Sequence, residues 1–166
     1  MTAGTRFEAL IERHHDELYG YLWRLVGDAA DAEDMTQEVF LRAYQAFPRL
    51  RANSNHRAWL YKIATNCAYT LLKRRHRAAS HQVALLDDVH AATEASPEAQ
   101  ADRRETMEAI GAAIESLPPK QRAAIILRHW QGLDYAAIAA ALDCSEDSAR
   151  ANVYQSIRRL RQVLGG

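Results

Sequence analysis

The sequence predicts an all-α protein with two small helical domains joined by a flexible linker, the second domain carrying a helix-turn-helix. Alanine is abundant, valine and isoleucine are sparse, and the 166 residues include only 7 glycines and 4 prolines, a composition that favours helices. Apolar residues recur at helical spacing, for example from Phe7 to Leu25. A chain of this length can form one compact domain or two small ones.

The first domain is assigned to residues 5–76, with three helices. Gly27 ends the first helix, because glycine readily takes the left-handed conformation found after a helix. Acidic residues open the second helix, where they suit the positive end of the helix dipole. The polar residues 53–55 can cap the third. The three helices are expected over residues 5–26, 28–46 and 57–75.

The second domain is assigned to residues 100–164, after a linker over residues 77–99, of which residues 77–96 show no clean apolar periodicity. Pro97 suits the first turn of a helix. Two consecutive prolines at 118 and 119 separate the next two helices, and Gly132 closes the later one. Four helices are expected, over residues 96–117, 119–131, 134–142 and 146–164.

The charges are segregated along the chain, although the net charge is zero. Residues 1–38 carry nine acids and three arginines, whereas residues 39–77 carry nine bases and no acid. From Arg150 to the C-terminus there are four arginines and no acid. Such a chain can present one face to nucleic acid and another to a basic partner.

The last two helices and the turn between them have the proportions of a DNA-binding helix-turn-helix. Ile138 and Leu142 of the shorter helix, with Ala149 and Val153 of the longer one, are expected in the core. The opposite face of the long helix carries side chains that can contact base edges in the major groove, and arginines further along that can meet phosphates. The first group is Ser148, Arg150, Asn152, Tyr154 and Gln155; the second is Arg158, Arg159 and Arg161.

The third helix of the first domain interleaves aromatic and cationic side chains. Trp59, Tyr61 and Tyr69 alternate with Lys62 and with the run 73–75. Aromatic rings beside positive charges suit single-stranded nucleic acid, whose exposed bases can stack on them. The alternative is that Trp59 belongs to the core and that the run 73–75 is a solvated helix end.

Several motifs, in order along the chain, resemble those of sigma factors of bacterial RNA polymerase. Residues 31–40 (DAEDMTQEVF) resemble a signature of sigma region 2, and residues 57–66 (RAWLYKIATN) resemble its part that handles the −10 promoter element. Residues 117–122 (LPPKQR) and 132–139 (GLDYAAIA) resemble region 4. Because the chain is too short for the other regions, the resemblance is to the compact extracytoplasmic-function (ECF) group.

This resemblance implies a division of roles for a non-enzymatic protein that brings core RNA polymerase to promoter DNA. The last helix would read the −35 element as duplex, and the first domain would hold the separated −10 strand. An anti-sigma factor is an expected further partner. The implied polymerase contacts are Asp31, Glu33, Asp34, Gln37 and Glu38, and the implied −10 contacts are Arg57, Tyr61, Lys62, Asn66, Lys73, Arg74 and Arg75.

The family often has glycine at the turn of the helix-turn-helix, where this chain has Asp143. Aspartate tolerates the left-handed conformation better than most residues, so the turn is expected to survive. The recognition helix also carries fewer cations than is usual in the family. The promoter sequence therefore cannot be transferred from relatives.

Two other classes of protein fit parts of the sequence. A stand-alone helix-turn-helix regulator would explain the second domain, but not the cations and aromatics of the first. An enzyme is disfavoured because no nucleophile motif or phosphate loop occurs, and because the adjacent His14 and His15 point about 100° apart on a helix. No metal, cofactor or small-molecule substrate is expected, and Cys67 and Cys144 match no metal or redox spacing.

A cytoplasmic protein is expected, without insertion into a membrane. No apolar stretch approaches the ~18 residues of a membrane span. The first residues carry charges of both signs and lack the apolar core of a signal peptide. The arrangement of the two domains in the free protein is left open.

Overall fold

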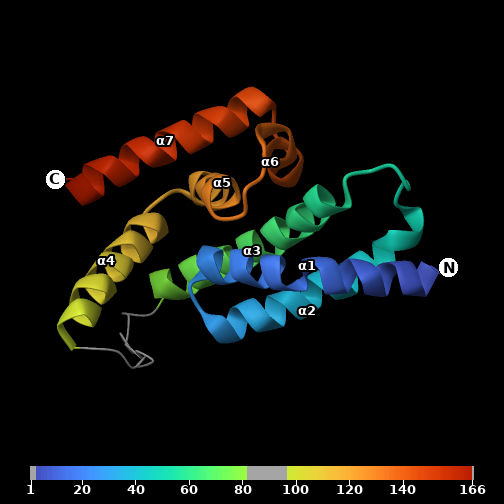
Figure 1. The fold of residues 1–166 in the computed structure, drawn as a ribbon, viewed down its shortest axis with the longest axis horizontal. Coiled ribbons are helices and arrows are strands. Elements are labelled where there is room, and N and C mark those ends of the chain that lie inside the picture. Colours follow the sequence, from blue (N-terminus) through green and yellow to red (C-terminus); the bar gives the residue numbers. More distant parts are fainter. Residues whose placement is uncertain (1–2, 82–96, 166) are drawn as a thin grey trace.

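The computed structural model describes residues 3–81 and 97–165, and all regular structure within these ranges is helical. The all-α prediction is therefore confirmed. Figure 1 shows α1, α2 and α3 packed together, with α5 and α6 lying on α1 and α3. The elements are α1 (Ala3–Val26), α2 (Ala29–Ala46), the 3-10 turn η1 (Phe47–Arg49), α3 (His56–His81), α4 (Pro97–Glu115), α5 (Pro119–His129), α6 (Tyr135–Leu142) and α7 (Glu146–Gly165).

The helix ends in the N-terminal half follow local chemistry. Gly27 has a φ of 76° after α1, and the Asp28 side chain accepts a hydrogen bond from the backbone N–H of Asp31 at the start of α2. Among the three candidate caps of α3, Asn55 caps the helix, because its Oδ1 accepts from the N–H of Ala58 at 3.1 Å.

In the N-terminal half, two boundaries differ by two residues or more from those expected from the sequence. Helix α1 already includes Ala3, so it begins two residues before the expected start at residue 5. Helix α3 continues to His81, so residues 77–81 of the expected linker are helical. Arg77, Ala78 and Ala79 follow Arg75, and arginine and alanine are good helix formers even without an apolar stripe. The remainder of the expected linker up to residue 96 lies outside the described residues.

In the C-terminal half, α4 leads into the three-helix unit of α5, α6 and α7. Pro119 opens α5, and Gly132 takes a φ of 70° after it. The expected core residues Ile138, Leu142, Ala149 and Val153 of α6 and α7 are all buried. None of the helices within residues 3–81 and 97–165 has the length and apolar character needed to cross a bilayer.

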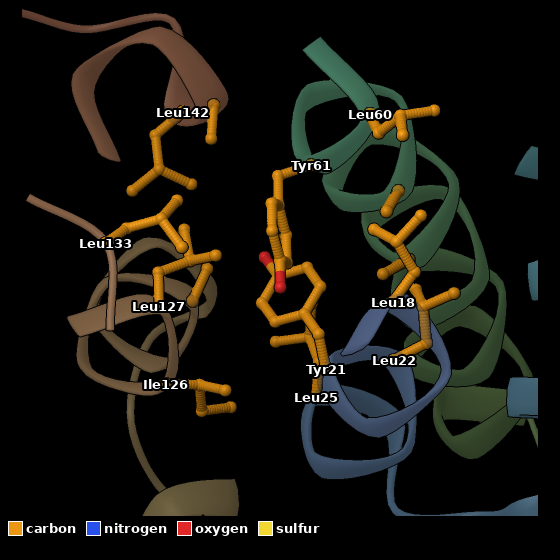
Figure 2. Close-up of a cluster of buried hydrophobic side chains, with 14 of the residues drawn as sticks. Leu18, Tyr21, Leu22, Leu25, Leu60, Tyr61, Ile126, Leu127, Leu133 and Leu142 are labelled. Atoms are coloured by element: carbon orange, nitrogen blue, oxygen red, sulfur yellow. The ribbon is translucent and has the colours of Figure 1, made fainter. Parts of the chain in front are cut away.

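The two halves share one hydrophobic core. Helix α6 packs on α3, and α5 packs on α1. Figure 2 shows Tyr21 and Tyr61 on the side of the N-terminal half that faces Leu127 and Leu133 of the C-terminal half. All four side chains are at most 1% exposed. The arrangement left open by the sequence is therefore a closed one, in which the apolar faces of both halves cover each other.

Candidate nucleic-acid interface

The predicted helix-turn-helix is formed by α6, a three-residue turn and α7. Asp134 caps α6 by accepting a hydrogen bond from the N–H of Ala137 at 2.8 Å. Asp143 adopts the left-handed conformation that the turn requires, with a φ of 53°. Ser145 then caps α7 through a hydrogen bond from the N–H of Ser148 at 3.0 Å. Asp134 and Ser145 thus mark where α6 and α7 begin, and Asp143 reverses the chain direction between them.

The outer side of α7 presents the side chains expected to contact base edges, which we call the recognition face (Ser148, Arg150, Asn152, Tyr154 and Gln155). Four of them are exposed, Tyr154 to 67%, and Asn152 is half-buried. Gln155 accepts a hydrogen bond from Gln121 of α5. The three arginines expected at phosphates, Arg158, Arg159 and Arg161, are exposed further along the same helix.

Tyr135, at the start of α6, holds two arginines against its ring. The Cζ atom of Arg128 lies 4.4 Å from the ring centroid, and that of Arg150 lies 4.8 Å from it. Both distances are within the range of cation–π attraction. Arg128 also donates a hydrogen bond to the carbonyl of Leu133. Sequence reasoning missed Arg128 and Tyr135, because nothing in the spacing of α5 and α6 indicates that they meet α7.

The residues implied as −10 contacts do not form one continuous exposed surface. Asn66, Lys73 and Arg74 are exposed on α3. Lys62 is partly exposed, with its Nζ 3.9 Å from a carboxylate oxygen of Asp143 in the other half. Arg57 and Tyr61 lie near the start of α3 and Arg75 lies near its end. All three already have partners within the protein.

Arg57 and Tyr61 lie at the boundary between the halves. Arg57 donates hydrogen bonds to both carboxylate oxygens of Glu17, the shortest at 2.9 Å, and to the carbonyl of Gln131 at 2.7 Å. The Tyr61 side chain is 0% exposed, and its hydroxyl accepts a hydrogen bond from Gln131. The expectation that Tyr61 is available to a strand therefore does not hold in this arrangement, because the same ring completes the shared core.

The burial and hydrogen bonds at this boundary shift the pKa values of Glu17, Arg57 and Tyr61. Burial raises the pKa of the Glu17 carboxyl, but hydrogen bonds and charge from Arg57 and His14 outweigh it and leave the pKa below its ordinary value. The hydrogen bond to Glu17 in turn raises the pKa of Arg57. Burial raises the pKa of Tyr61 to about 12, so this hydroxyl stays protonated at neutral pH.

The two histidines considered above as possible enzyme residues contact carboxylates of their own helix, α1. His14 Nδ1 lies 2.5 Å from Glu17 Oε1, and His15 Nδ1 lies 3.2 Å from an oxygen of Asp16. Among the residues that the structure describes, no three His, Cys, Asp or Glu side chains gather in a way that could hold a metal ion.

The residues implied as polymerase contacts form an acidic patch along α2 (Asp31, Glu33, Asp34, Gln37 and Glu38). All but Asp31 are exposed. Asp31 is paired with Arg75 of α3, which also donates to the carbonyl of Val26. Glu38 pairs with Arg42 one turn later, at 2.8 Å. Glu33, Asp34 and Gln37 are thus the members whose side chains are most available to a partner.

Comparison with known proteins shows the same two parts in the same order. Residues 10–78 match the family profile described as "Sigma-70 region 2", and residues 107–160 match "Sigma-70, region 4". The chain is 30% identical over 165 residues to the RNA polymerase sigma-H factor of Pseudomonas aeruginosa, covering 95% of this chain and 86% of the relative. It is 32% identical over 157 residues to the ECF RNA polymerase sigma-E factor of Escherichia coli K12, covering 90% and 82%.

The fold has solved counterparts over nearly the whole chain. The sigma factor RpoE of Bartonella quintana, solved in complex with the anti-sigma factor NepR, superposes with a TM-score of 0.75 at 23% identity, covering 96% of this chain and 97% of that one. CnrH, solved in complex with the cytosolic domain of CnrY, superposes with a TM-score of 0.72 at 20% identity, covering 96% and 87%.

Proposed function

The chain belongs to the ECF group of sigma-70 factors and acts as a sigma factor of RNA polymerase in transcription initiation; from this premise we propose how its residues divide the work. The match to regions 2 and 4, in order along one chain, is the observation that carries the function. The mechanism is recruitment of the polymerase followed by capture of the −10 strand. Neither step makes or breaks a covalent bond, so the protein needs no catalytic residue, cofactor or metal of its own.

Region 2 is assigned to residues 5–76 and region 4 to residues 100–164, with residues 77–99 joining them. Region 2 would bind core polymerase and the −10 element, and region 4 would bind the −35 element. The helical continuation of α3 to His81 would shorten the part of the connection that can bend.

The recognition face of α7 would read the −35 duplex from the major groove. Arg150 can donate two hydrogen bonds to guanine, and Asn152 can pair with adenine in the same bidentate manner. Tyr135 would act as a positioning residue, because its ring limits the directions in which the Arg150 guanidinium can point. Arg128 on the other side of that ring, and Arg158, Arg159 and Arg161 on α7, would meet phosphates.

The −10 strand would lie along α3. Asn66, Lys73 and Arg74 are accessible to it in the closed arrangement. Arg57, Tyr61 and Arg75 would contribute only after their present partners release them, whereas Lys62 is held only by an exposed contact with Asp143. A base flipped out of the strand costs a few kcal/mol of stacking, which an aromatic and cationic surface can offset.

The acidic patch of α2 would dock on the clamp helices of the largest polymerase subunit. The exposure of Glu33, Asp34 and Gln37 supports this role. An anti-sigma factor is a proposed third partner, because the similar structure of RpoE was solved with one. The proposed place of action is the cytoplasm, where these partners meet.

Run-off transcription with purified core polymerase and fragmented DNA from the source genome tests the proposal. Discrete transcripts that appear only with this protein are expected, and their start sites reveal the promoters. No transcripts, together with tight binding of duplex DNA by the protein alone, would favour a stand-alone regulator instead.

A further inference from the structure

Gln155 of the recognition face is held by a side chain of another helix. Helix α5 packs along α7 (Figure 1), and Nε2 of Gln121 on α5 donates a hydrogen bond to Oε1 of Gln155 at 3.0 Å. One residue further along α7, the fully buried Ser156 donates from its Oγ to the backbone carbonyl of Gln121 at 2.7 Å. This buried contact fixes the two helices against each other next to Gln155, so the exposed contact between the two glutamines has a rigid support.

The direction of this hydrogen bond follows from the surroundings of Gln121. A glutamine amide has one oxygen, which accepts, and one nitrogen, which carries two donors. Oε1 of Gln121 is buried and has no hydrogen-bond partner within the described residues. Turning the amide over would bury the nitrogen there and leave its donors unpaired, a less favourable state than one underused carbonyl oxygen. Gln121 therefore presents its nitrogen, and not its oxygen, to Gln155.

The contact determines which end of the Gln155 amide is available to DNA. An amide carries its oxygen and its nitrogen on opposite sides of one carbon atom, so an oxygen turned towards α5 leaves the nitrogen turned away from it. The exposed Gln155 lies three residues after Asn152, on the same stripe of α7. To pair with adenine, a glutamine must accept from the N6 amino group and donate to N7 at the same time. Because its oxygen is engaged by Gln121, Gln155 is oriented as a donor only.

We propose that Gln121 is a positioning residue for promoter reading: it orients Gln155 as a hydrogen-bond donor, so that Gln155 selects a base with a keto oxygen, guanine or thymine, in the −35 duplex. In the major groove, guanine O6 and thymine O4 accept hydrogen bonds, whereas adenine and cytosine present an amino group at the equivalent place. This inference rests on the proposed reading of the −35 duplex by the recognition face. It adds a residue outside the recognition helix, and it names the class of base that one contact selects.

The substitution Gln121→Met in the full chain tests the positioning role, with Gln162→Met at an exposed position of α7 as the matched control. Methionine is close to glutamine in length but has no donor for the Gln155 oxygen. It also removes the buried unpaired oxygen, so the fold should be retained, which circular dichroism and thermal unfolding check. The polymerase holoenzyme is then titrated, at one fixed salt concentration, with promoter duplexes in which each −35 base pair is replaced in turn.

The wild type and the control should prefer guanine or thymine over adenine by roughly tenfold at one −35 position. Gln121→Met should lose this preference, because Gln155 can then rotate its amide and pair with adenine through both atoms. Gln121→Glu should reverse it towards adenine or cytosine, since a carboxylate only accepts and Gln155 then donates to it and presents its oxygen to the base. A change of stability alone would alter the affinities for all duplexes together and leave their ratios unchanged. Ratios that stay unchanged in Gln121→Met overturn the proposal.

Gln155→Ala separates the positioning role from the base contact on which it rests. This variant should lose the same preference, and adding Gln121→Met to it should change the ratios no further. If Gln155→Ala loses the preference but Gln121→Met retains it, the base contact stands and the positioning role fails. If Gln155→Ala retains every preference, the assignment of Gln155 to base reading fails, and the positioning role fails with it. A shift caused by Gln121→Met in the Gln155→Ala background would mean that Gln121 acts through another group, which also overturns the proposal.

Discussion

Arg150 and Asn152 offer a residue-scale test of promoter reading. Both belong to the recognition face, and neither is in the hydrophobic core. Replacing either by alanine should weaken binding of the −35 duplex by about 1–3 kcal/mol, the value of a lost base contact, and relax the preference at one base pair. Affinities of the polymerase holoenzyme for promoters with single −35 substitutions measure this. The exposed Gln162 on the same helix is the control, and unchanged preference in both variants would place the recognition face elsewhere.

Tyr135 should affect DNA binding only by positioning Arg128 and Arg150 against its ring. Tyr135→Phe keeps the ring and should bind the −35 duplex like the wild type, whereas Tyr135→Leu should lose about 0.5–1 kcal/mol, the value of an exposed cation–π contact. The loss should shrink in an Arg150→Ala background, which a double-mutant cycle measures. An equal loss in both backgrounds would mean that Tyr135 only stabilises the fold.

Glu17 makes stability depend on pH. Since its pKa in the folded state lies below the ordinary value of 4.5, the ionised carboxylate stabilises the fold above that pH, and the stabilisation is lost as the pH falls through the folded-state pKa. Glu17→Gln should lower the free energy of unfolding by about 1–3 kcal/mol at neutral pH. In urea titrations, the difference from the wild type should shrink at acidic pH. A pH-independent difference would show that the charge of Glu17 is not the stabilising feature.

At the scale of elements, the turn between α6 and α7 depends on one left-handed residue. Asp143 has a φ of 53°, where the Cβ of an L-residue is unfavourable, and its pairing with Lys62 at 3.9 Å is too exposed to contribute much. Asp143→Gly should therefore raise the free energy of unfolding by about 1 kcal/mol, and Asp143→Ala should lower it. Thermal unfolding of the full chain measures both. A melting temperature raised by alanine would contradict the strain argument.

Helix ends were predictable because their causes are local. Gly27 and Gly132 take positive φ values where the sequence suggested stops, and Asp28 and Asn55 cap the helices that follow them. The six residues of α3 beyond Arg75 were not predicted as helix, because the periodicity of apolar residues stops before the backbone helix does.

At the scale of the whole molecule, the packing of region 4 on region 2 had no signal in the sequence. Gln131 lies in a turn, where a polar residue needs no partner, and its bond to Glu17 spans 114 residues. Tyr61 fits equally well into an aromatic strand-binding surface and into a core, and only the tertiary structure distinguishes these. The recognition face was predictable in outline, because α7 has one apolar side and the DNA contacts must lie opposite it.

Assembly with the polymerase should depend on where charge is placed and not only on how much there is. Asp34 is exposed on the acidic patch, whereas Glu12 is exposed on α1 outside it. The substitutions Asp34→Arg and Glu12→Arg change the net charge equally, so any general electrostatic effect on association is shared. Asp34→Arg should weaken core binding in a titration of labelled protein and should retain the circular dichroism of the wild type. Glu12→Arg should bind nearly normally. If both variants lose the same affinity, the patch acts through overall charge; if neither does, the acids of α2 only stabilise their own helix.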